Sequence, residues 1–111
     1  MAAPPRHPDV DQVDLSTLYD ALSDPLRRRI IEMLGDGAEL NCAVFYSLGS
    51  KSQLSYHLAR LREAGLTMTR VAGRQHFIRL RAEEIEQWMP GWLDAVLGSL
   101  RAEGKAPAAA E

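Results

Sequence analysis

The sequence predicts one mainly α-helical domain with a β-hairpin, in the order α-α-α-α-β-β-α. Apolar residues recur at helical spacing over residues 15–64, alternate with polar residues on both sides of Gly73, and return to helical spacing over residues 82–100. With 111 residues, the chain has room for a single hydrophobic core. We expect three segments along the chain, namely a flexible tail at 1–13, the domain at 14–100 and a second flexible tail at 101–111.

The first two helices are predicted by apolar spacing and by the residues that begin the second helix. Leucine and tyrosine side chains stand at i, i+3, i+4 and i+7 over residues 15–22. Asp24 is a good N-terminal cap, and Pro25 suits the first helical position because its missing N–H would have no helical partner there. We therefore expect a second helix that begins at Pro25 and is ended by Gly35 or Gly37.

The next two helices are closely spaced. Apolar residues predict a short helix over residues 39–47, closed by Gly49. Ser50 and Gln53 have the spacing of a capping box, in which each side chain accepts a hydrogen bond from the backbone of the other residue, and the helix that follows stops at Gly65. Two helices joined by Ser-Leu-Gly-Ser have the spacing of a helix-turn-helix motif.

After Gly65 the pattern becomes that of a hairpin followed by a long helix. Residues 66–71 and 75–80 are strand-like and are joined by a glycine-containing turn. Residues 82–100 keep one apolar stripe, and Pro90 lies off this stripe, so that it predicts a kink or a new turn rather than the end of the element. A helix-turn-helix followed by a hairpin and a helix is the element order of a winged helix-turn-helix domain.

Charge is distributed unevenly along the chain. The formal net charge is −2, but residues 50–81 carry seven basic and one acidic side chain, a balance of +6. Residues 1–49 and 82–111 each have a balance of −4. A positive block over the second helix of the motif and the hairpin is typical of a surface that binds a polyanion. Charge alone leaves a solvated charged surface as the alternative.

We expect DNA contacts from the start of the second helix of the motif and from the hairpin. Short polar side chains at that helix start read base edges, while arginines bind phosphates. At the hairpin tip, an arginine can also enter the minor groove. The candidates for base reading are Lys51, Ser52, Gln53, Ser55 and Tyr56, among which the capping role of Gln53 competes with base reading. The candidates for phosphate binding are Arg60, Arg70 and Arg74.

Three segments resemble the ArsR/SmtB family of bacterial transcriptional repressors. Residues 21–30, ALSDPLRRRI, are similar to the family's opening "ALADPTRRRIL", and residues 50–66 to its recognition helix. Residues 71–80 are similar to the "G-R-x-x-x-Y-x-L" pattern of its wing. The resemblance covers residues 15–97 and implies a homodimeric winged helix that binds operator DNA, represses transcription and, in many members, responds to a metal ion.

This sequence departs from the ArsR/SmtB family in the metal-binding motifs. Many members carry Cys-Val-Cys in the third helix, whereas this chain has Cys42 alone, which we interpret as a small, partly buried apolar residue. Glu83 and Asp94 lie about three helical turns apart, and His7 lies in an acidic N-terminal segment of the kind that some nickel-sensing members use. These three residues are the candidate ligands for Ni(II) or Zn(II), and solvated acidic side chains are the alternative.

The last helix carries more apolar surface than a helix at the end of a small domain buries. Pairing with the first helix of a second copy would cover this surface, and packing within one chain is the alternative. The candidate interface residues are Leu15, Leu18, Trp88, Trp92 and Val96. A twofold dimer presents its recognition helices to half-sites roughly 34–36 Å apart, so we expect an inverted-repeat operator.

Other classes of protein are less compatible with the sequence. The chain shows neither a nucleophile paired with a base nor a phosphate-binding loop, so we do not expect an enzyme. No apolar run is long enough to cross a bilayer, and the single cysteine fits a reducing cytoplasm. A winged-helix interaction module, or a co-regulator that needs a partner protein, is the alternative to a DNA-binding regulator.

Overall fold

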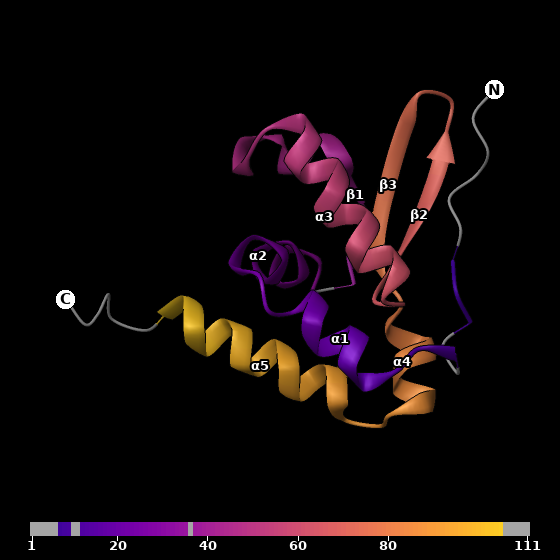
Figure 1. Cartoon of the computed structure of the whole chain (residues 1–111), viewed down its shortest axis with the longest axis vertical. Helices are drawn as coiled ribbons and strands as arrows, with labels where there is room; N and C mark the ends of the chain where they lie inside the picture. The colour runs from indigo at the N-terminus through magenta and orange to yellow at the C-terminus, as the bar shows by residue number, and fades with distance from the viewer. Residues whose placement is uncertain (1–6, 10–11, 36, 106–111) are drawn as a thin grey trace.

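A long β-hairpin projects from a body of helices (Figure 1). The computed structural model describes residues 7–9, 12–35 and 37–105, so most of the expected tails, at 1–6, 10–11 and 106–111, lies outside the described residues. The elements in chain order are α1 (Leu15–Ala21), α2 (Pro25–Leu34), β1 (Leu40–Asn41), the 3-10 helix η2 (Cys42–Leu48), α3 (Lys51–Glu63), β2 (Thr67–Ala72), β3 (Gln75–Leu80), α4 (Ala82–Trp88) and α5 (Trp92–Lys105).

Helices α1 and α2 begin at the aspartates that precede them. The Asp14 carboxylate accepts a hydrogen bond from the Thr17 N–H at 2.7 Å. The Asp24 carboxylate accepts one from the Leu26 N–H at 2.8 Å and one from the Arg27 N–H at 3.1 Å, and Pro25 occupies the first helical position. The predicted second helix and its cap are therefore confirmed.

The segment before α3 differs from the predicted helix over residues 39–47. Leu40 and Asn41 form the short strand β1, which pairs antiparallel with Ile78 and Phe77 of β3. A 3-10 helix follows, and the Asn41 side chain caps it by accepting from the Ala43 N–H at 3.0 Å. The first residues are extended rather than helical because they pair with the far edge of the hairpin, a partner that local spacing does not reveal.

Helix α3 begins with the predicted capping box and ends near Gly65. The Gln53 N–H donates to Ser50 Oγ at 3.2 Å, and the Ser50 N–H donates to Gln53 Oε1 at 3.0 Å. Gly65 has a φ of 84°, and a Cβ at this position would lie 2.5 Å from Val13 Cγ2. Glycine is therefore required both by the left-handed backbone and by the chain segment that packs over it.

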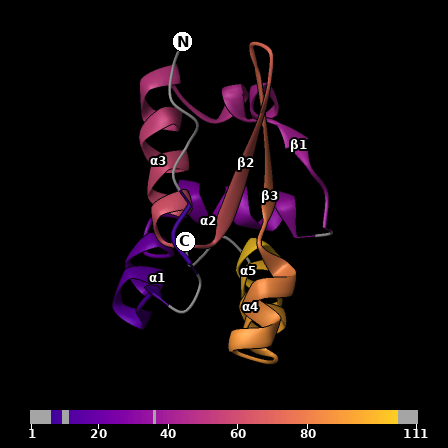
Figure 2. The same ribbon diagram turned by 90° about the vertical axis from the view of Figure 1, so that its right-hand side faces the viewer.

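The sheet has the order β1-β3-β2, with β3 in the middle (Figure 2). Strands β2 and β3 pair from Thr67 opposite Leu80 to Ala72 opposite Gln75, so that Gly73 and Arg74 form a two-residue loop. Gly73 has a φ of 63°, which is the conformation that such tight loops require at their first residue. The predicted hairpin is confirmed, with its first strand displaced by one residue.

The predicted single helix over residues 82–100 is divided in two. Helix α4 ends at Trp88, and α5 begins at Trp92, with Gly91 between them at a φ of 83°. Pro90 cannot donate a helical hydrogen bond, so the chain turns here instead of kinking. Helix α5 then continues to Lys105, so residue 100, the expected end of the domain, lies inside it.

The hydrophobic core is drawn from nearly every element. Ile30, Ile31 and Leu34 of α2 are fully buried at its centre, and Phe45 of η2 is also completely enclosed. Leu93 and Leu97 hold α5 against this core, where α2 and α5 pack together. The part of the chain that the structure describes contains no helix long and apolar enough to cross a membrane.

Candidate nucleic-acid interface

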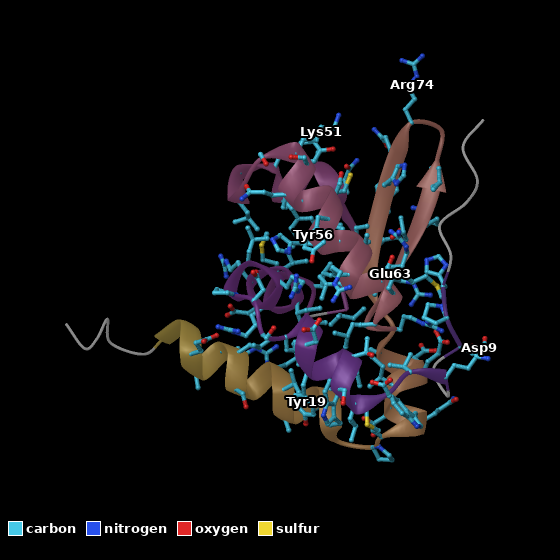
Figure 3. The ribbon with its side chains drawn as sticks, viewed as in Figure 1. Asp9, Tyr19, Lys51, Tyr56, Glu63 and Arg74 are labelled. Atoms are coloured by element: carbon cyan, nitrogen blue, oxygen red, sulfur yellow. The ribbon has the colours of Figure 1, made fainter. Side chains whose placement is uncertain are left out.

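The start of α3 and the hairpin tip lie at the same end of the molecule. Figure 3 shows Lys51 at the beginning of α3 and Arg74 extending from the tip of the hairpin, while Tyr19 lies at the opposite end. Five side chains of the first turns of α3 are exposed, namely Lys51, Ser52, Gln53, Ser55 and Tyr56. The structure thus brings together, on one exposed surface, the residues that the sequence assigned to base reading.

The Gln53 side chain is engaged in the capping box, as its spacing from Ser50 predicted. Its side-chain oxygen accepts from the Ser50 N–H at 3.0 Å and also from the Ser50 hydroxyl at 3.2 Å. Only the side-chain NH2 group of Gln53 therefore lacks a partner among the described residues. Gln53 can donate to a base acceptor, but it cannot accept from a base without opening the start of the helix.

The three candidate phosphate-binding arginines differ in their surroundings. Arg60 donates to the Asp20 carboxylate at 2.7 Å, and Arg70 donates to the Glu39 carboxylate at 2.8 Å. These hydrogen bonds raise the pKa of both arginines, and the bond from Arg70 lowers the pKa of Glu39. Arg74, in contrast, is exposed and has no acidic partner among the described residues. Arg74 is therefore ready for a phosphate, whereas Arg60 and Arg70 would have to release a carboxylate first.

A buried arginine, Arg27, contacts α3, and the sequence alone did not predict this role. Arg27 is 6% exposed, and its guanidinium donates to the backbone oxygens of Ala21 at 2.7 Å and Asp20 at 3.2 Å. Its third contact is with His57 Nδ1 of α3, at 3.0 Å. A guanidinium only donates, so His57 accepts at Nδ1 and its proton lies on Nε2. Local spacing along α3 does not reveal this partner, because Arg27 lies 30 residues before His57 in the chain.

The three candidate metal ligands do not come together. His7 Nε2 accepts from the Thr69 N–H at 3.0 Å, beside the hairpin. Glu83 and Asp94 line a different cavity, between α4 and α5. Over residues 7–9, 12–35 and 37–105, no three His, Cys, Asp or Glu side chains are grouped so that they could hold a metal ion. The described donors therefore do not fit a Ni(II) or Zn(II) site within one chain.

The candidate dimer residues divide into exposed and buried ones. Leu15 is 50% exposed on α1, and Trp92 and Val96 are partly exposed on α5. Tyr19 joins them, because its ring makes an edge contact with the Trp92 ring at 6.2 Å and its hydroxyl accepts from the Trp92 N–H. Leu18 is only 1% exposed and belongs to the core of its own chain, which corrects its assignment to the interface.

Comparisons with known proteins agree with this geometry. A family model described as a helix-turn-helix domain matches residues 22–70. The regulator YceK of Bacillus subtilis, an HTH-type transcriptional regulator, is 38% identical over 85 residues, which cover 71% of this chain and 82% of YceK. The arsenical resistance operon repressor of Staphylococcus xylosus is 32% identical, over 66% of this chain and 71% of that protein. The chain belongs to the ArsR family of helix-turn-helix transcriptional regulators.

Two further proteins are similar to this chain. The arsenic resistance transcriptional regulator ArsR1 of Pseudomonas putida is 35% identical over 72% of this chain, which spans 60% of the length of ArsR1. The structure of HlyU from Vibrio cholerae superposes with a TM-score of 0.60 at 31% identity, covering 73% of this chain and 85% of HlyU. The winged helix-turn-helix fold and the resemblance predicted from the sequence are confirmed.

Proposed function

We propose that this ArsR-family chain represses transcription as a homodimer that binds an inverted-repeat operator. One observation carries the proposal: the exposed start of α3 and the free Arg74 lie at one end of the molecule, and the apolar surface of α1 and α5 lies at the other (Figure 3). A twofold dimer formed through that apolar surface leaves both α3 helices free to meet DNA.

DNA reading is assigned to the exposed polar residues at the start of α3. Ser52, Ser55 and Tyr56 have side chains that both donate and accept, so they can distinguish base edges in the major groove. Lys51 and Arg74 supply positive charge at the same end of the molecule, from the start of the helix and from the hairpin tip. Phosphate contacts of this kind make affinity fall steeply as salt concentration rises.

Dimer formation is assigned to the surface of Leu15 and Tyr19 on α1, Trp88 at the end of α4, and Trp92 and Val96 on α5. Tyr19 and Trp92 already contact each other, so this surface is continuous across the two helices. Aromatic side chains of this size contribute strongly to interfaces because they bury much apolar area with few rotatable bonds. Burial of the same surface on both protomers yields the twofold symmetry that an inverted repeat requires.

The proposal is tested by titrating the full chain into labelled duplexes from its own promoter region and into random duplexes, at two salt concentrations. We expect tight binding to one promoter duplex that exceeds binding to random DNA and weakens steeply with salt. Equal, weak binding to all promoter and random duplexes would contradict sequence-specific repression. Absence of binding even at low salt would favour the interaction module instead.

The same titration with added Ni(II) or Zn(II) examines whether His7, Glu83 and Asp94 contribute to a metal response. Because the described donors lie apart within one chain, we expect operator affinity to be unchanged by either ion. A metal-dependent change that His7→Ala removes would contradict this expectation.

A further inference from the structure

A cleft separates the recognition helix from the hairpin, and it shares Lys51, Ser55 and Arg74 with the proposed DNA surface. It has a volume of about 430 Å³ and lies between α3, η2 and the paired strands β2 and β3. Its apolar lining comes from Leu54, Leu58 and Ala59 of α3 and from Ile78 of β3. This volume is within the range of pockets that hold small organic molecules.

The charged side chains that line the cleft are all basic. Lys51 and Arg62 contribute from α3, Arg74 from the hairpin tip, and His76 from β3, whereas no aspartate or glutamate lines it. Lys51 and Arg74 are exposed at the outer end (Figure 3). A concave surface with one sign of charge and apolar walls concentrates small ions of the opposite sign.

Among the basic residues that line the cleft, Arg62 has a buried side-chain atom, Nε, without a hydrogen-bond partner among the described residues. The other arginines of the positive block include Arg60, Arg70 and Arg81, and each of these three is paired with a carboxylate. A buried donor without a partner is costly, so an acceptor brought by a ligand would remove that cost.

We propose that this cleft binds a small organic anion with an apolar body. The carboxylate of the ligand pairs with Arg62, and its apolar body lies against Leu54, Leu58 and Ile78. A guanidinium recognises a carboxylate through parallel hydrogen bonds, which explains the choice of a carboxylate over a neutral group. The ligand class is therefore a medium-chain or aromatic carboxylate.

Occupation of the cleft is coupled to DNA binding, and this second step rests on the proposed function. Lys51 and Arg74 belong both to the cleft and to the proposed DNA surface, so an occupant of the cleft changes the surroundings of residues that phosphates use. It also lies between α3 and the hairpin, the two elements that meet the duplex. By linkage, an anion that weakens DNA binding is itself bound less tightly in the presence of operator DNA.

The site is tested on the full chain with a fluorescent probe, 8-anilinonaphthalene-1-sulfonate, which joins an apolar body to an anion. We expect saturable binding of one probe per chain, displaced by octanoate but not by octanol. In Arg62→Gln the affinity for octanoate falls by about tenfold, the loss of one charge-assisted pair. Arg62→Lys, which keeps the charge, retains part of the affinity. The control Arg29→Gln removes an exposed arginine outside the cleft and binds like the wild type.

Several outcomes would contradict the proposed carboxylate-binding site. Octanol displacing the probe as well as octanoate would show a merely apolar cleft. Equal octanoate affinity in Arg62→Gln and wild type, with both chains giving the same thermal unfolding curve, would show that Arg62 does not hold the anion. If octanoate binds but leaves the affinity for operator DNA unchanged, only the coupling is contradicted. If the wild-type chain fails to bind operator DNA specifically when octanoate is absent, the proposed function is contradicted instead.

Discussion

His7 is held against the hairpin by a hydrogen bond that requires a neutral imidazole. Its Nε2 accepts from the Thr69 N–H at 3.0 Å, on the edge strand β2. Partial burial is the main cause that lowers the pKa of His7, and the nearby positive charges of Arg62 and Arg81 lower it further. A protonated Nε2 could not accept, so this contact depends on pH.

We expect the contact between His7 and Thr69 to weaken on acidification. Because the folded-state pKa of His7 is lowered, its stabilising contribution is complete well above pH 6.5, the unfolded value, and declines as pH falls through and below it. Amide hydrogen exchange checks this: protection of the Thr69 amide should be lower at about pH 5.5 than at about pH 7.5, after correction for intrinsic rates. In His7→Gln this difference should disappear. Equal protection at both pH values in the wild type would contradict the expectation.

Arg60 is held by Asp20, and this pair sets how much Arg60 can contribute to DNA binding. Both side chains are largely exposed, so the pair itself adds little to stability. We expect Asp20→Asn to raise affinity for any duplex and to steepen its dependence on salt by about one unit of slope for each chain bound, because Arg60 becomes free for a phosphate. Electrophoretic titration at several salt concentrations measures this slope. If the slope stays unchanged, Arg60 does not face DNA.

At the scale of elements, Arg27 links the end of α1 to the recognition helix. Its guanidinium bonds to two backbone oxygens of α1 and to His57 of α3, within a nearly closed environment. Helix α1 also carries part of the apolar surface assigned to the dimer. The orientation of α3 is therefore tied, through one side chain, to the end of the molecule where we place the second copy.

We expect Arg27→Met to lower the free energy of unfolding by about 1–3 kcal/mol, since buried acceptors lose their donors while most of the apolar volume is kept. Urea unfolding followed by circular dichroism measures this loss. Arg29→Met, a change at an exposed position on the same helix, serves as the control and should alter stability by less than about 0.5 kcal/mol. Equal losses in both variants would show that the buried contacts of Arg27 do not stabilise the fold.

The sequence could predict those elements whose ends are determined locally. Asp24 with Pro25, the Ser50–Gln53 capping box and the Gly73 turn are local signals, and each is found where it was expected. Strand β1 could not be predicted, because its partner β3 lies nearly forty residues further along the chain. The pairing of Arg60 and Arg70 with acids of other elements escaped prediction for the same reason. Pro90 predicted a kink or a new turn within one element, whereas the chain divides there into α4 and α5.

At the scale of the whole molecule, the two proposed functional surfaces lie at opposite ends. The start of α3 and the hairpin tip lie at one end, and helices α1 and α5, which carry the exposed apolar side chains, lie at the other (Figure 1). Leu15 and Tyr19 are exposed in the single chain, which is unusual for large apolar side chains that share a surface with a tryptophan. In the proposed dimer, a second copy would cover them without approaching the DNA surface.

We expect Leu15→Glu to weaken dimer formation by at least about tenfold, because a charge replaces an exposed apolar side chain in the proposed interface. Sedimentation at several protein concentrations checks this. Val44→Glu makes the same change at an exposed apolar residue of η2, far from α1, and should leave the association unaffected. Identical sedimentation of Leu15→Glu and the wild type would place the interface elsewhere.

The central claim is that the start of α3 and the hairpin tip face DNA, and the salt dependence of operator affinity in Arg74→Gln tests it most directly. Arg74 has no acidic partner among the described residues, so its removal disturbs no ion pair seen there. In Arg74→Gln we expect the slope of log affinity against log salt concentration to be smaller by about one for each chain bound. The control Arg29→Gln removes the same charge from α2 and should leave this slope unchanged. Equal slopes in the two variants would contradict the claim.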